Sequence, residues 1–135
     1  MCCRKLIGAR YFINGFYAAY GGLNFSATGE FFSPRDRGGH GTHTLSTAGG
    51  NFVRNASLYG HAEGVAKGGA PHARVATYKV CWPDDNGDYS CYDADILAAF
   101  DVGMHDGVDV FSISLGGFSP NYFQSSVSIG SFHAV

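Results

Sequence analysis

The sequence predicts an α/β protein with a mainly parallel sheet. A β-rich run at residues 73–80 comes before a run at residues 93–106 whose apolar side chains recur at helical spacing, and a second β-rich run follows at residues 108–115. Strand, helix and strand in this order predict a βαβ unit. Its crossover should be right-handed, with the two strands parallel and the helix covering them.

The first half of the chain predicts fewer regular elements. Residues 1–32 are rich in aromatic residues and glycine with little periodicity, and they predict a short strand followed by a loop. The polar run at residues 33–39 predicts a turn. It leads into a short helix at residues 40–48, which the glycines at residues 49–50 should end. Residues 51–72 predict an irregular connection.

The second half gives clearer boundaries. The turn-forming cluster at residues 82–87 should end the first strand of the βαβ unit. Asp93 is a plausible N-cap of the following helix, and Gly107 stands where a left-handed cap ends a helix. Residues 125–135 contain spaced apolar side chains and predict the start of another helix.

Composition excludes several classes of protein. The chain has 135 residues, a formal net charge of −2 and 15% charged residues, so no basic excess favours nucleic acid or anionic lipid as a partner. No apolar run is long enough for a membrane-spanning helix, and the first ten residues lack the apolar core of a signal peptide. The low charge and 20 glycines suit a compact domain or an interior slice of a larger one. Two glycan acceptor tripeptides, at Asn24 and Asn55, favour a secreted, extracellular protein.

The segment from Asp36 to His43 is the densest polar cluster of the chain. His40 is flanked by glycines on a loop that enters a helix, and the helix dipole there disfavours a positive imidazole. A neutral ring suits a general base, whereas the alternative is an ordinary structural histidine. A further alternative is a metal pair of His40 and His43, with Glu63 or Asp36 as a third ligand. No cofactor is predicted.

Three motifs resemble one family. GHGTHT after SPRD, then GGAPHARVATYKVCW, then DADILAAFDVGMHDGVDVFSISLGG closely resemble the subtilisin-like serine proteases of peptidase family S8, particularly the plant subtilases similar to cucumisin. The resemblance implies a three-layer α/β fold and a serine endopeptidase that cleaves peptide bonds through an acyl-enzyme. It also implies that His40 is the catalytic base and that His43, one helical turn further on, is structural.

The family's other two catalytic residues are not found. Its aspartate lies in an Asp-Ser/Thr-Gly motif before the histidine, and its serine in a GTSMS-like motif after SLGG; residues 1–135 contain neither. Asp36 precedes His40 but belongs to the SPRD loop, so it is not assigned the role. We therefore expect residues 1–135 to be a partial catalytic domain, inactive alone, with its N- and C-terminal parts missing. The alternative is a non-catalytic truncated product that at most binds peptide.

The SLGG motif is the second functional candidate. Ser114, Leu115 and Gly116 should end a parallel strand, where α/β sheets commonly bind ligands, and an extended peptide could pair there as an added strand. The resemblance implies that these residues form one wall of the substrate cleft, and that the loop with Gly87 and Tyr89 forms the other. Without the resemblance, the favoured interpretation of the motif is a strand that simply stops at a glycine turn.

None of the spacings between the four cysteines matches a paired C-x-x-C zinc site. The resemblance implies a disulfide between Cys81 and Cys91, which bracket the predicted cleft loop. Two buried free thiols are the alternative. The adjacent Cys2 and Cys3 are not expected to bond to each other.

Overall fold

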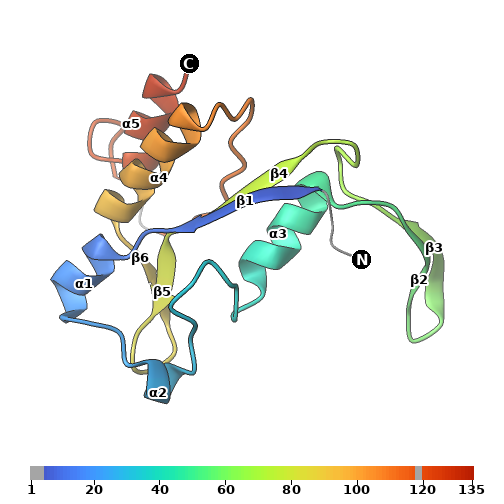
Figure 1. The fold of residues 1–135 in the computed structure, drawn as a ribbon, viewed down its shortest axis with the longest axis horizontal. Helices are drawn as coiled ribbons and strands as arrows, with labels where there is room; N and C mark the ends of the chain where they lie inside the picture. Colours follow the sequence, from blue (N-terminus) through green and yellow to red (C-terminus); the bar gives the residue numbers. More distant parts are fainter. Residues whose placement is uncertain (1–4, 118–119) are drawn as a thin grey trace. The chain divides into compact units, whose positions relative to one another are not determined.

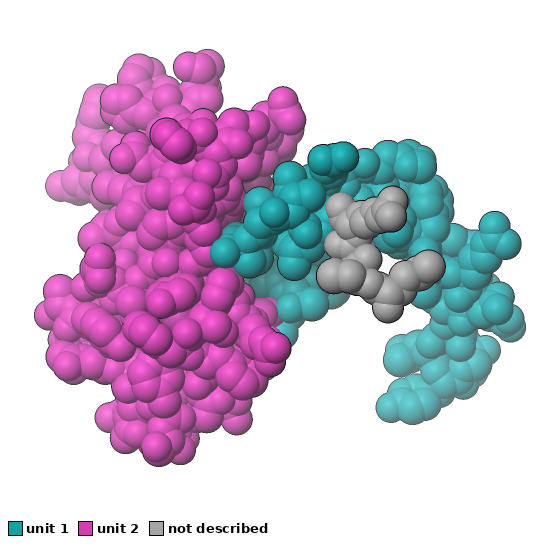
Figure 2. All heavy atoms as spheres, viewed as in Figure 1, with its two compact units in different colours: residues 1–9, 38–77 teal, residues 10–37, 78–135 magenta. Residues whose placement is uncertain are grey.

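The computed structural model describes residues 5–117 and 120–135, and Cys2 and Cys3 lie outside them. The chain divides into two compact units, coloured separately in Figure 2. Unit 1 comprises Met1–Ala9 and Gly38–Thr77, and unit 2 comprises Arg10–Arg37 and Tyr78–Val135.

Strands β1 and β4 form a two-stranded sheet (Figure 1). Val75 N donates to Lys5 O at 2.9 Å, and further along Phe12 N donates to Lys79 O at 2.8 Å. The paired positions advance together along the chain, so the strands are parallel. The predicted α/β class with a parallel sheet is confirmed. The strands span Leu6–Tyr11 and Val75–Lys79.

Unit 1 contains a helix and a hairpin. Helix α3 (His40–Gly49) confirms the predicted helix. The prediction of an irregular connection at residues 51–72 is wrong, because β2 (Val53–Leu58) and β3 (His61–Ala66) pair there in antiparallel fashion. The hairpin is exposed along most of its length, so no alternation of apolar and polar residues reveals it. Its register also shifts twice, and Asn55 has a positive φ of 58°.

Two short helices in unit 2 correct the prediction of a loop after the first strand. Helix α1 buries only Phe16 among its seven residues, which explains why the sequence shows no helical periodicity. It ends at Gly21, whose φ of 74° is in the left-handed region. Helix α2 is capped by Asn24, whose Oδ1 accepts from Ala27 N at 3.1 Å. These helices span Asn14–Tyr20 and Phe25–Thr28.

One core of unit 2 surrounds the only tryptophan of the chain. Trp82 is fully buried and packs with Ile13 and Phe16. Its Nε1 donates to Phe12 O at 2.6 Å, so the polar end of the indole has a partner inside the core. The core therefore joins the segment after β1 to strand β5 (Cys81–Pro83), which contains Trp82.

Helices α4 (Asp93–His105) and α5 (Ser126–His133) pack against each other in unit 2 (Figure 1). Both helices were predicted; the N-cap of α4 is Tyr92 rather than Asp93, and Gly107 has the expected left-handed φ of 76°. Between these helices, the ring of Phe100 occupies the space that a Cβ at residue 130 would fill, so glycine is required there.

The predicted strand at residues 108–115 is wrong. The segment forms no strand, and within the described residues β4 is paired with β1 and not with this segment. Phe111 turns inward, with its ring centroid 5.0 Å from that of Phe100, while Val110 is 82% exposed. Ser114–Gly116 therefore lie in an irregular segment rather than at the end of a strand.

No helix in residues 5–117 and 120–135 combines the length and the apolar character needed to cross a membrane.

Candidate catalytic histidine and cleft residues

His40 is the first residue of helix α3 and is exposed. The preceding Gly39 has a φ of 85°, a conformation that costs glycine little and other residues more. Gly39 O accepts from His43 N at 3.0 Å, which begins the helical ladder. The glycine thus turns the chain into the helix directly before the imidazole, at the end where unpaired amides carry partial positive charge.

Three hydroxyls that follow His40 donate to the backbone of their own helix. Ser46 Oγ donates to His43 O at 2.7 Å, and Thr47 Oγ1 donates to the same oxygen at 2.9 Å. Thr44 Oγ1 donates to Gly41 O at 3.1 Å. The part of the chain that the structure describes contains no group of three His, Cys, Asp or Glu side chains placed to hold a metal ion.

Gly87 and Tyr89 lie together on the hairpin formed by β5 and β6 (Tyr89–Cys91). Asp84 organises the turn, because its Oδ1 accepts from the backbone N–H groups of Asn86 and Asp88, each at 2.9 Å. Gly87 has a φ of 88°, which favours glycine at this position. Local hydrogen bonds therefore fix the shape of the loop that the resemblance places in the cleft.

A disulfide joins Cys81 and Cys91, as expected. The two residues are direct partners in the antiparallel register, so their side chains lie on the same face of the hairpin. The bond closes the hairpin at the end opposite the turn.

We expect the double variant Cys81→Ser, Cys91→Ser to lower the free energy of unfolding by about 3 kcal/mol, because the ten-residue separation of the cysteines sets the loop entropy removed from the unfolded chain. Equilibrium urea unfolding with and without reductant measures the effect. Reductant should leave the unfolding midpoint of the double variant unchanged. A wild-type midpoint that reductant leaves unchanged would contradict the prediction.

A buried carboxylate, that of Glu30, contacts Tyr89. The side chain of Glu30 is 0% exposed and forms an ion pair with Lys79 at 3.0 Å. Burial opposes ionisation of Glu30, but hydrogen bonds from Phe31 N, Lys79 and Tyr89 outweigh it and hold the pKa of Glu30 below its usual value. Burial and the bond to Glu30 raise the pKa of Tyr89 to about 12, so its phenol stays protonated and donates.

Glu30 was not predicted from the sequence, because it belongs to none of the motifs. One indication was available, since it is the only acidic residue among the first 35 and stands beside two phenylalanines. Glutamate is almost never fully buried unless it is paired, so a glutamate enclosed by an aromatic segment requires specific partners.

Ser114, Leu115 and Gly116 are exposed in the irregular segment of unit 2. A Cβ placed on Gly116 would meet no atom within 4 Å, so the space beside its backbone is open. The structure thus places Gly87 and Tyr89 on one hairpin and the SLGG residues in another segment of unit 2. His40 belongs to unit 1.

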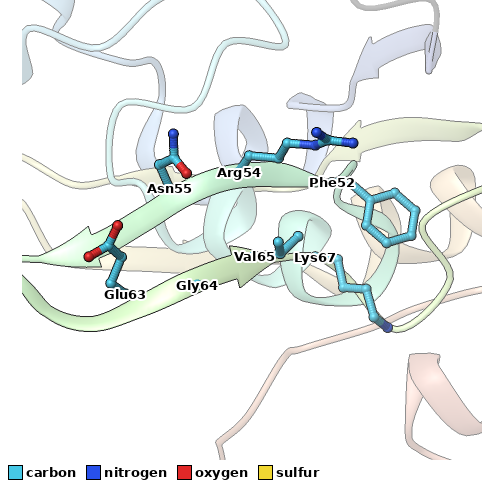
Figure 3. Close-up of a pocket in the computed structure, with 7 residues that line it drawn as sticks. All are labelled: Phe52, Arg54, Asn55, Glu63, Gly64, Val65 and Lys67. Atoms are coloured by element: carbon cyan, nitrogen blue, oxygen red, sulfur yellow. The ribbon is translucent and has the colours of Figure 1, made fainter.

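A hollow of about 950 Å³ lies along the exposed β2–β3 hairpin of unit 1. It includes Asn55 but none of the predicted catalytic or cleft residues. Figure 3 shows its side chains leaving the two strands in different directions rather than converging on one point. The hollow is lined by Phe52, Arg54, Asn55, Glu63, Gly64, Val65 and Lys67.

Comparison with known proteins gives one consistent result. Residues 22–133 match the subtilase family, peptidase S8. The chain is 62% identical over 133 residues to subtilisin-like protease SBT5.3 of Arabidopsis thaliana, covering 98% of this chain and 17% of that protein. It is 57% identical over 134 residues to SBT5.4 and 52% identical over 139 residues to SBT3.6, both subtilisin-like proteases of the same plant; each alignment covers 99% of this chain and 17% or 18% of the relative. The chain, which spans about a sixth of the length of these relatives, belongs to the subtilase family.

Proposed function

We propose that this chain is the histidine-bearing segment of a secreted subtilisin-like serine endopeptidase, with His40 as general base. The observation that carries the proposal is the position of His40: it is the first residue of α3, introduced by the left-handed Gly39, within a sequence that belongs to the subtilase family. Other segments of the same catalytic domain supply the aspartate and the serine.

The reaction follows from these roles. A ring nitrogen of His40 accepts the serine hydroxyl proton while the serine oxygen attacks the carbonyl carbon of the peptide bond. The imidazolium then gives this proton to the departing amine, which leaves an acyl-enzyme. Water then attacks the acyl carbon while His40 accepts a proton from it. The acid product leaves, and the imidazolium returns the proton to the serine oxygen. The aspartate stabilises the imidazolium in both halves of the reaction.

The substrate is a peptide or protein in extended form. Ser114–Gly116 are exposed and lie in no strand of the described structure, so their backbone is available to pair with a peptide main chain. Gly87 and Tyr89 provide the opposite wall of the cleft. The net charge of −2 favours neither nucleic acid nor an anionic membrane surface as a partner.

The secreted location rests on two observations. The Cys81–Cys91 disulfide is typical of an oxidising compartment. Asn24 and Asn55 both carry acceptor tripeptides for glycans and are exposed. A mass shift on deglycosylation of the protein from its native source tests this part of the proposal.

We expect purified residues 1–135 to hydrolyse no peptide, because a general base without a nucleophile has nothing to activate. The measurement is release of a fluorescent leaving group from a generic peptide substrate, with His40→Ala as the matched control. Turnover that the control abolishes would contradict the prediction.

A complete protein that contains this segment tests the proposed activity directly. A serine-directed phosphonate should label and inactivate it, and a chelator should leave it active. Inhibition by the chelator alone would support the metal-pair alternative instead. A transcript without an aspartate motif upstream and a serine motif downstream would support the non-catalytic alternative.

A further inference from the structure

The buried carboxylate of Glu30 connects three segments of unit 2. Its Oε1 accepts from Phe31 N at 2.8 Å and from Lys79 Nζ at 3.0 Å, and its Oε2 accepts from the Tyr89 hydroxyl at 2.9 Å. Each oxygen therefore has a donor, and the donors come from the segment before the SPRD loop, from β4 and from the β5–β6 hairpin. A buried ion pair contributes little net stability. The role of Glu30 is therefore better explained by the three segments that its carboxylate connects than by stability.

Lys79 holds the carboxylate in place. Its side chain is 10% exposed, and Nζ also donates to Arg35 O at 2.8 Å. The same ammonium lies 4.1 Å from the centroid of the buried Trp82 ring, a distance suited to a cation–π interaction. Lys79 thus links Glu30 to the core of unit 2, so the position of the Glu30 carboxylate does not depend on Tyr89.

Tyr89, in contrast, is 45% exposed and lies on a strand of three residues. An exposed aromatic side chain on a short hairpin exchanges between rotamers unless another contact selects one. The hydrogen bond to Glu30 joins the mobile end of the ring to the fixed carboxylate. The disulfide fixes the hairpin backbone at Cys91, two residues away, but leaves the orientation of the ring undetermined.

We propose that Glu30 is a positioning residue for substrate binding, which orients the ring of Tyr89 as a wall of the peptide cleft. Glu30 itself touches no substrate and acts through Tyr89. This inference rests on the proposed function, since it assigns a role within the same site.

The test uses a complete subtilase that carries this segment, with the variants Glu30→Gln, Tyr89→Phe and the double variant. Gln at residue 30 removes the charge and keeps the shape, and Phe at residue 89 removes only the hydroxyl. Asp101→Asn, at an exposed position of helix α4, is the matched control. Steady-state kinetics compare a peptide of eight residues, which spans the cleft, with a single-residue ester that does not.

We expect Glu30→Gln and Tyr89→Phe each to raise KM for the long peptide by about tenfold, with kcat unchanged and the ester unaffected, because the hydrogen bond to a charged group is lost. The double variant should be no worse than either single variant, since both remove the same interaction, the hydrogen bond between the Tyr89 hydroxyl and an ionised carboxylate. The control should match wild type. Additive changes in KM, equal losses for both substrates, or no change in Glu30→Gln would overturn the inference.

A structural measurement separates this inference from the proposed function. In a crystal structure of the Glu30→Gln protein, we expect the Tyr89 ring in more than one rotamer or in a different one. If the wild-type protein hydrolyses no peptide, the proposed function fails, but the conformation of the Tyr89 ring in this structure still tests the positioning role of Glu30. A single, unchanged ring conformation would overturn the positioning role.

Discussion

Replacing His40 with alanine in a complete subtilase that carries this segment should lower kcat/KM by about 10⁴-fold or more, the loss typical of removing the base from a Ser-His-Asp triad. His40 is exposed at the first position of α3, so the substitution leaves no cavity in a core. The expected loss is therefore catalytic rather than structural. Hydrolysis of a fluorogenic peptide measures it, and thermal unfolding checks that the fold is retained.

The matched control is His43→Ala. His43 lies one turn further along the same helix and is also exposed, so the substitution changes the same residue type in a similar setting. We expect activity within a few-fold of wild type. Losses of equal size in the two variants would assign the effect to the helix and would contradict a specific role for His40.

The second large effect concerns stability. Asp95 is 2% exposed and accepts from Gly15 N at 3.0 Å and from Phe16 N at 3.1 Å, so a side chain of α4 satisfies two amides at the start of α1. Asp95→Ala leaves both amides without this acceptor inside unit 2. We expect the free energy of unfolding to fall by about 3–5 kcal/mol, since both bonds involve a buried polar group.

Urea unfolding of residues 1–135 measures this loss. The fluorescence of the buried Trp82, which lies in the same unit as Asp95, monitors the transition. Asp93→Ala is the matched control, because Asp93 shares the first turn of α4 but is exposed. Its loss should stay below about 1 kcal/mol, which is the usual effect of one acidic residue at a helix N-terminus. Equal losses in the two variants would show that the contacts to α1 contribute nothing.

The elements that were predicted correctly have local causes. Helix α4 has apolar residues at helical spacing and Gly107 after its end, and β4 is a run of β-forming residues. The errors have non-local causes. Residues 108–115 have the composition of a strand, but a strand also needs a neighbour, and within the described structure none is paired with them. Helix α1 buries a single side chain, so its sequence lacks a periodic pattern.

The residues of the candidate site also fall into those that local sequence could predict and those that it could not. His40 and the SLGG residues were identified because they belong to contiguous motifs, and the Cys81–Cys91 disulfide because the resemblance implied it. Glu30 could not be identified in this way, since its partner Lys79 is 49 residues away in sequence. Only the folded chain brings that pair together with Tyr89.

The irregular segment at residues 108–117 also affects how the protein must be handled. Its backbone lies in no strand of the described structure, and Val110 and Ile113 expose apolar side chains along it. An open stretch of this kind is a template for strands of other molecules. The backbone proposed to receive a substrate is thus also an aggregation hazard. Preparations of residues 1–135 should therefore lose solubility as their concentration rises, and a bound extended peptide should delay that loss.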